Sequence, residues 1–156
     1  MPGEGMRSAK VAIAGMGALI VAGCAPSTPE AMRDAPPKSR TFDVAADYEK
    51  VFAREQEGFL RCLTGNYYNF TFSISPRIDH AKKTASIPLT QFGVVPGDQV
   101  WALVDIRANG DGTTVTADTT NHPLMADFPE IAEVWANGGM QCPKYSITTW
   151  QSPKSQ

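Results

Sequence analysis

Three cysteines and two histidines are the residues of this chain most able to do chemistry: Cys24, Cys62, Cys142, His80 and His122. Thiolates and imidazoles bind zinc at short, regular spacings, and they also act as nucleophiles and general bases. Neither histidine stands at such a spacing from another histidine or from a cysteine. The sequence therefore predicts no metal site, and the cysteines need another explanation.

A catalytic group could still assemble in space, from Ser73 or Ser75 with His80 and Asp79. No strand-turn-helix nucleophile motif surrounds either serine, and the chain has no glycine-rich phosphate-binding motif. The polarity of a loop explains His80 and Asp79 more simply. We therefore expect no catalysis and no cofactor.

The first cysteine follows a segment that is built like an export signal. Arg7 and Lys10 supply positive charge, and residues 11–22 are all apolar or small. A membrane-spanning helix needs roughly 20 apolar residues, which makes that alternative unattractive. The run ends in Val21-Ala22-Gly23-Cys24, which resembles the lipobox of bacterial lipoproteins. An ordinary secretory signal, cut elsewhere, would leave this match unexplained.

The lipobox resemblance implies a protein that is anchored to a membrane. Residues 1–23 would be removed, and Cys24 would carry three acyl chains, palmitate among them, where a single chain binds only marginally. In such lipoproteins an Asp after the cysteine favours the inner membrane, so Ala25 implies the outer membrane and a domain that faces the periplasm. Residues 24–40 are rich in proline and poor in large apolar residues, which predicts a flexible tether.

The same assignment resolves the odd number of cysteines. With Cys24 acylated, Cys62 and Cys142 remain in an oxidising compartment, where only one pairing is possible. The alternative is two reduced thiols, as in a cytosolic protein. A disulfide that closes so long a loop stabilises a domain by roughly 4–5 kcal/mol.

The composition limits the partners. The net charge of −2 becomes −3 when the signal segment, with Arg7, Lys10 and Glu4, is removed. A weakly acidic domain has no basic surface for nucleic acid. We expect a membrane and another envelope protein as partners, and the sequence carries no signal for an oligomeric state.

Two predicted helices position the cysteines. Residues 45–63 have apolar side chains at helical spacing, with Asp43 as the expected N-cap and Gly65 as the stop. A second helix is predicted from Pro129, after a cap at Asp127. A disulfide would then join the ends of the two helices.

Between the helices the period changes to two, which predicts strands over residues 66–74, 84–90, 99–108 and 113–119, with a short one over 41–44. Pro88 cannot donate to a ladder, so a free side or a bulge is expected there. Residues 109–112, Asn-Gly-Asp-Gly, predict a hairpin turn, because Arg107 stands where a calcium loop needs an oxygen ligand. The fold class is a two-layer α+β domain over residues 41–152, with an antiparallel meander of three to five strands and a tail over 153–156.

This arrangement resembles a recurrent, uncharacterised type of proteobacterial lipoprotein. Its features are a helix that ends in cysteine, several strands, and a tryptophan-glycine-cysteine sequence near the end. Here those residues are Cys62, Trp135, Gly138 and Cys142, and the resemblance covers residues 41–142. The type carries no agreed activity.

One predicted face of the sheet suggests a binding surface. If Val100 and Ala102 face the helices, period two places Trp101 and Leu103 opposite, with Tyr67 beside them. Such an apolar patch is usually covered or used for binding. We expect the tail to fold back and cover this patch through Tyr145, Ile147 and Trp150. The alternative is that a partner binds to the patch.

We therefore expect an envelope lipoprotein that acts by binding, in an accessory or scaffold role. The alternative is a small-ligand carrier or an enzyme, with a pocket between the helices and the sheet. A filled core favours the first function, and a deep apolar pocket with converging polar groups favours the second.

Overall fold

The computed structural model describes residues 26–67, 69–93 and 97–144. Its centre is a seven-stranded sheet in the order β1-β7-β6-β5-β3-β2, with β4 also paired to β5. Every pair of neighbouring strands is antiparallel. The strands are β1 (Lys38–Val44), β2 (Gly65–Tyr67), β3 (Phe70–Ile74), β4 (Arg77–Asp79), β5 (Thr84–Gly93), β6 (Gln99–Asn109) and β7 (Gly112–Thr119).

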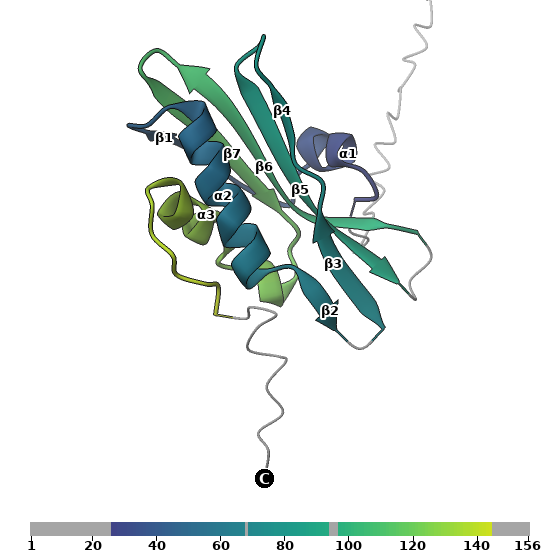
Figure 1. The fold of residues 1–156 in the computed structure, drawn as a ribbon. Helices are drawn as coiled ribbons and strands as arrows, with labels where there is room; N and C mark the ends of the chain where they lie inside the picture. The colour runs from purple at the N-terminus through teal and green to yellow at the C-terminus, as the bar shows by residue number, and fades with distance from the viewer. Residues whose placement is uncertain (1–25, 68, 94–96, 145–156) are drawn as a thin grey trace, which may run out of the picture.

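The helices lie on both faces of this sheet. They are α1 (Pro29–Asp34), α2 (Tyr48–Cys62) and α3 (Phe128–Ala136), and a short 3-10 turn, η1 (Pro123–Met125), precedes α3. Figure 1 shows α2 and α3 together on one face, here called the helical face, and α1 alone on the other, the outer face. The predicted mixture of helices and antiparallel sheet is confirmed, but the sheet has more strands than the three to five expected.

The helix α2 forms where its apolar spacing predicts it, although both of its ends differ from the prediction. The N-cap is Asp47, whose Oδ1 accepts a hydrogen bond from the Lys50 N–H at 2.9 Å. Asp43, the expected cap, stays in β1 and accepts from the Thr114 hydroxyl. The helix ends at Cys62, and Gly65 already belongs to β2, with φ at 143°.

The helix α3 begins with proline in its first turn, as predicted, and ends before Gly138, which has φ at 91° and donates to the Trp135 carbonyl. Asp127 occupies the N-cap position but makes no side-chain cap bond. Its Oδ2 accepts instead from the Lys144 N–H at 2.9 Å, so Asp127 holds the segment after α3 against the start of that helix.

The strand predicted over residues 66–74 is in fact a hairpin of β2 and β3, in which Tyr67 pairs with Phe70. Asn69, which suits a turn, interrupts the alternating pattern there. Pro88 was expected to lie at a free side of its strand or at a bulge, and on one side of β5 no described strand pairs with it. The strand β4 pairs with β5 up to Ser86, and β3 pairs with it from Leu89, so the missing N–H of Pro88 falls in the gap between them.

The expected tether over residues 24–40 is wrong for most of its length. Residues 29–34 are the helix α1, and β1 begins at Lys38. The proline content was taken to indicate a flexible segment. However, Pro29 occupies the first turn of α1, where proline is tolerated, and the Thr28 side chain caps the helix by accepting a hydrogen bond from the Ala31 N–H. Met32 is completely buried.

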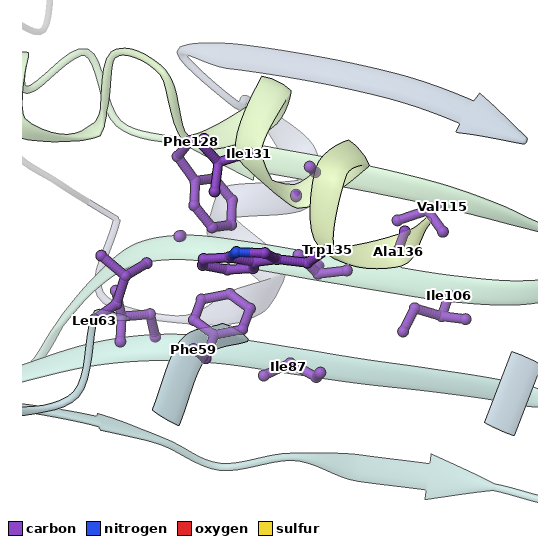
Figure 2. Close-up of a cluster of buried hydrophobic side chains, with 14 of the residues drawn as sticks. Phe59, Leu63, Ile87, Ile106, Val115, Phe128, Ile131, Trp135 and Ala136 are labelled. Carbon is purple, nitrogen blue, oxygen red and sulfur yellow. The ribbon is translucent and has the colours of Figure 1, made fainter. Parts of the chain in front are cut away.

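The core on the helical face is built around three aromatic rings. Figure 2 shows Trp135 of α3 between Phe59 of α2 and Phe128, and the ring centroids lie 5.6 Å and 6.2 Å apart. Its indole Nε1 donates to the Gln141 carbonyl at 2.7 Å. A Cβ at Gly58 would lie 2.2 Å from the Trp135 ring, so only glycine lets α2 and α3 pack this closely. Paired aromatic rings add about 0.5–1.5 kcal/mol each beyond their buried area.

Candidate binding site

The structure confirms the disulfide between Cys62 and Cys142, whose Cα atoms lie 5.4 Å apart. Cys62 is the last residue of α2, and Cys142 lies in the segment beyond α3. The bridge therefore ties the end of α2 to that segment. Cys24, the expected lipidation site, lies outside the described residues.

The predicted apolar patch of Tyr67, Trp101 and Leu103 is not one surface. Leu103 is fully buried on the outer face, where it forms a cluster with Val100 and Met32. Trp101 packs against the core of the helical face, with its ring 5.4 Å from Phe72. Tyr67 is half-buried at the end of β2.

A β-bulge separates Trp101 from Leu103. Leu89 of β5 pairs with Ala102, but the next residue, Thr90, pairs with Val100, so Trp101 is an extra residue in β6. One extra residue reverses the alternation of side chains before it. Val100 therefore faces outward with Leu103, and the prediction for both Val100 and Trp101 was wrong.

The apolar part of the outer face is covered by α1, which contributes Met32. The tail residues Tyr145, Ile147 and Trp150, which were expected to provide this cover, lie outside the described residues. The segment expected to be a tether is thus part of the folded body.

Beyond α1, the outer face opens into a polar hollow of about 700 Å³, here called the basin. Strands β4 to β7 form its floor, and Arg33 of α1 forms one wall. Its polar lining comprises Arg33, Arg77, Asp79, Thr84, Ser86, Asp105, Arg107, Asn109, Thr114 and Thr116.

The strand register explains why these side chains meet. Arg77 pairs with Ser86, Ser86 with Asp105, and Asp105 with Thr116. Paired residues on antiparallel strands present their side chains to the same face, so these four form a row across the sheet. A second, parallel row comprises Asp79, Thr84, Arg107 and Thr114. Threonine suits such strands because its branched side chain fits the pleat while its hydroxyl reaches solvent.

One arginine of the basin is committed to the fold. Arg33 binds Asp105 through two hydrogen bonds, of 2.6 Å and 2.8 Å, and also donates to the Ser86 hydroxyl at 2.9 Å. The hydrogen bond to Asp105 raises the pKa of Arg33, against the lowering effect of burial. This pairing uses the Asp105 carboxylate and fixes α1 on the sheet.

The other acidic groups near the basin are also occupied. Asp79 accepts from the Lys82 N–H at 3.0 Å, and this bond lowers the pKa of Asp79. Asp118 lies under α1 and accepts from the Ser39 hydroxyl, while burial raises the pKa of its carboxyl group. Within residues 26–67, 69–93 and 97–144, no ion pair engages Arg77 or Arg107.

Two exposed guanidinium groups without a carboxylate partner can bind an anionic group. Guanidinium forms paired hydrogen bonds to carboxylate or phosphate, and hydroxyls such as that of Thr84 add further donors. The basin is open, and charged and hydroxyl groups line it together with apolar ones, so it suits a polar ligand or a charged segment of a partner better than an apolar small molecule.

The two histidines take part in other contacts. His80 Nδ1 lies 3.0 Å from Glu49 and 3.1 Å from the Tyr48 hydroxyl, both on α2. His122 Nδ1 accepts from the Leu124 N–H, and the centroid of its ring lies 4.6 Å from that of Trp101, with the two rings tilted by 49°. The serine–histidine grouping considered from the sequence is therefore not assembled around His80. In the part of the chain that the structure describes, no group of His, Cys, Asp and Glu is placed to hold a metal.

A buried carboxyl group in the core was missed by the sequence analysis. Glu55 of α2 is fully buried, and neither of its carboxyl oxygens has a hydrogen-bond partner among the described residues. Desolvation alone raises the pKa of Glu55 well above its ordinary value. The burial of Glu55 could have been predicted from the sequence, because Glu55 lies four residues from both Val51 and Phe59 and so falls in the apolar stripe of the helix.

Comparisons with known proteins do not add to this site: no family model, curated protein or solved structure matches the chain. None of the helices within the described residues has the length and apolar character to cross a membrane.

Proposed function

We propose that this chain is a membrane-anchored envelope lipoprotein that acts by binding, with the basin as its binding site. Three features of the sequence support the anchor: the positive charge of Arg7 and Lys10, the apolar run over residues 11–22, and the lipobox match that ends in Cys24. Ala25 favours the outer membrane and a domain that faces the periplasm.

The observation that carries the binding role is the pair of guanidinium groups of Arg77 and Arg107 in the basin, which form no ion pair with any described residue. An arginine on a protein surface commonly pairs with a nearby carboxylate, and here Asp105 and Asp79 are already used by other partners. Arg77 and Arg107 therefore offer their donors to something outside the fold. An anionic group of carboxylate or phosphate chemistry, on a ligand or on another envelope component, fits them. An accessory or scaffold role follows from such binding.

The alternative is a small-ligand carrier or an enzyme with a pocket between helices and sheet, and Glu55 is the observation that favours it. A buried acid with a raised pKa is a common feature of active sites. However, Glu55 is completely enclosed, and no charged group contributes to its pKa shift. The aromatic rings of Phe59, Phe128 and Trp135 fill the space between the helices, which favours binding on the outer face.

The anchor is tested by metabolic labelling with palmitate in a bacterial host. We expect label on the wild-type chain and none on Cys24→Ser, because the thiol is the point of attachment. Labelling that persists in Cys24→Ser would contradict the anchor.

The binding role is tested by NMR on residues 24–156 carrying Cys24→Ser, titrated with inorganic phosphate. We expect saturable shifts of the side-chain Nε–H signals of Arg77 and Arg107. Arg61 is the matched control, because it is an exposed arginine on α2, outside the basin. Equal, non-saturating shifts of all three signals would show that the basin is not a built anion site.

A further inference from the structure

The folded body begins very close to the expected lipid. The carbonyl of Pro26 accepts a hydrogen bond from the Val100 N–H at 2.7 Å. Val100 lies beyond the end of the β6–β7 ladder, whose last pair joins Ala102 to Thr119, so Pro26 satisfies a donor that β7 does not reach. The chain is thus attached to the sheet from Pro26 onward.

The segment after Pro26 is also held against the sheet. Met32 is buried against Val100 and Leu103, and Arg33 is fixed to Asp105 and Ser86. Residues 26–33 therefore run along the outer face from the beginning of β6 towards its middle. Figure 1 shows α1 lying against this face of the sheet.

Only Ala25 separates Pro26 from Cys24. Two residues span at most about 7 Å between their Cα atoms, even when the chain is fully extended. A lipid attached at Cys24 would therefore hold the domain directly at the bilayer surface, and the attachment point is the end of the sheet where β6 begins.

An exposed aromatic side chain lies at the same end of the sheet. Phe92 and Leu60 are the large hydrophobic residues that the described part of the chain exposes, and Phe92 is 37% exposed. Phe92 lies on the outer face, because it alternates in phase with Ser86 and Thr90 along β5. Since Thr90 pairs with Val100, the Cα atom of Phe92 is about 8 Å from that of Val100.

The positions of the charged side chains favour one orientation of the domain on the lipid surface. Glu30 and Asp34 are exposed on α1, and the lipid surface of bacterial membranes is commonly anionic. Seating the domain on the flat side of α1 would bring two carboxylates, Glu30 and Asp34, against like charge. The end near Phe92 also exposes a carboxylate, Asp98, but it places an apolar ring in the interface.

We propose that the domain rests on the lipid surface through the end of the sheet at Val100 and Phe92, with the Phe92 ring among the lipid headgroups. This inference rests on the proposed acylation of Cys24. The basin then stays in water, because Arg107 lies seven residues along β6 from Val100, about 23 Å away.

The test uses the full acylated chain in vesicles of phosphatidylethanolamine and phosphatidylglycerol. A fluorescent label is attached at Phe92→Cys, and spin-labelled lipids serve as quenchers. Asp111→Cys is the matched control, because it is exposed in the turn between β6 and β7, beyond the basin. In both variants the new thiol is the one to label, since Cys62 and Cys142 are bonded and Cys24 is acylated.

We expect quenching at position 92 to be at least three-fold stronger than at position 111. A second variant inserts ten Gly and Ser residues between Ala25 and Pro26, and it should reduce the quenching at position 92 towards that of the control. Equal quenching at the two positions in vesicle-bound protein overturns the proposed seating alone, and so does quenching that the insertion leaves unchanged. A chain that does not float with the vesicles overturns the acylation as well.

Discussion

The two faces of the sheet differ in what covers them. The helical face is sealed by α2 and α3, whose aromatic side chains Phe59, Phe128 and Trp135 are completely buried. Among the described residues, the outer face is covered at one end, where Met32 of α1 packs over Val100 and Leu103. Beyond Arg33 it presents hydroxyls and charges to solvent. The buried aromatic core on the helical face therefore contributes much of the stability of the fold, and the polar outer face is where we propose that binding takes place.

Each face contains a residue that departs from this division. Glu55 is a carboxyl group in the sealed core, and Phe92 is an aromatic side chain exposed on the polar face. The first is unfavourable for the fold because its oxygens are desolvated without partners. The second is explained if the membrane lies beside it. Substitutions on the two faces should therefore have different consequences.

Loss of the disulfide on the helical face should have the largest effect. The bridge joins residues 80 positions apart, and the loop-closure entropy of such a loop corresponds to about 4–5 kcal/mol. The double variant Cys62→Ala/Cys142→Ala should lower the free energy of unfolding in urea by about this amount. A loss below about 1 kcal/mol would show that the two helices hold together without the bridge.

Gly58→Ala should lower the free energy of unfolding by about 1–3 kcal/mol, because its Cβ would overlap the Trp135 ring. On an exposed helix position the same change is favourable by about 0.5–1 kcal/mol. The control is the same substitution in a Trp135→Leu background, where the overlap is relieved. If Gly58→Ala costs as much there, contact with Trp135 is not the cause.

Glu55→Gln should remove a pH dependence of stability. The fold raises the pKa of Glu55 above its unfolded value of about 4.3, so the folded state keeps this proton after the unfolded state has released it. The contribution of Glu55 is therefore fully present below pH ~4.3 and is lost as the pH rises to the folded pKa, by about 1.4 kcal/mol per pH unit. At neutral pH, Glu55→Met should stabilise the fold by about 1–3 kcal/mol.

The control for this prediction is Glu57→Gln, on the exposed side of the same helix. Denaturation across pH 4–8 should show the slope in wild type and in Glu57→Gln but a smaller one in Glu55→Gln. Identical slopes in all three chains would mean that Glu55 reaches solvent or a partner.

Arg33→Lys should have the smallest effect on global stability, below about 1 kcal/mol, because the Arg33–Asp105 pair is partly exposed. Lysine keeps the charge but not the two-pronged geometry, so α1 should loosen on the outer face. Hydrogen exchange at the Met32 N–H, which is bonded to the Thr28 carbonyl, should become faster. Arg40→Lys, at an ion pair with Glu133 on α3, should leave that rate unchanged.

The regular parts of the fold were predictable because they follow from local chemistry. The apolar spacing of α2, the alternation of β5 and the Asn-Gly-Asp-Gly turn each depend on neighbouring residues. The disulfide was predictable from the cysteine count once Cys24 was assigned to lipid.

The candidate site was not predictable, because it depends on contacts between distant segments. The basin needs the register that brings Arg77 of β4 into line with Asp105 of β6, and no local pattern fixes that register. The bulge at Trp101 cannot be recognised from the order of apolar and polar residues in β6. The helix α1 is too short to form alone, and it exists through Met32 and Arg33, whose partners lie far along the chain.

Binding on the outer face can be tested by photo-crosslinking in intact cells. A photoreactive amino acid is placed either at Thr84 in the basin or at Ala53, exposed on α2. We expect a discrete adduct with an envelope component from position 84, which is lost in Arg77→Gln/Arg107→Gln, and no adduct from position 53. An equal adduct from position 53, or an adduct at position 84 that survives loss of both arginines, would contradict this proposal.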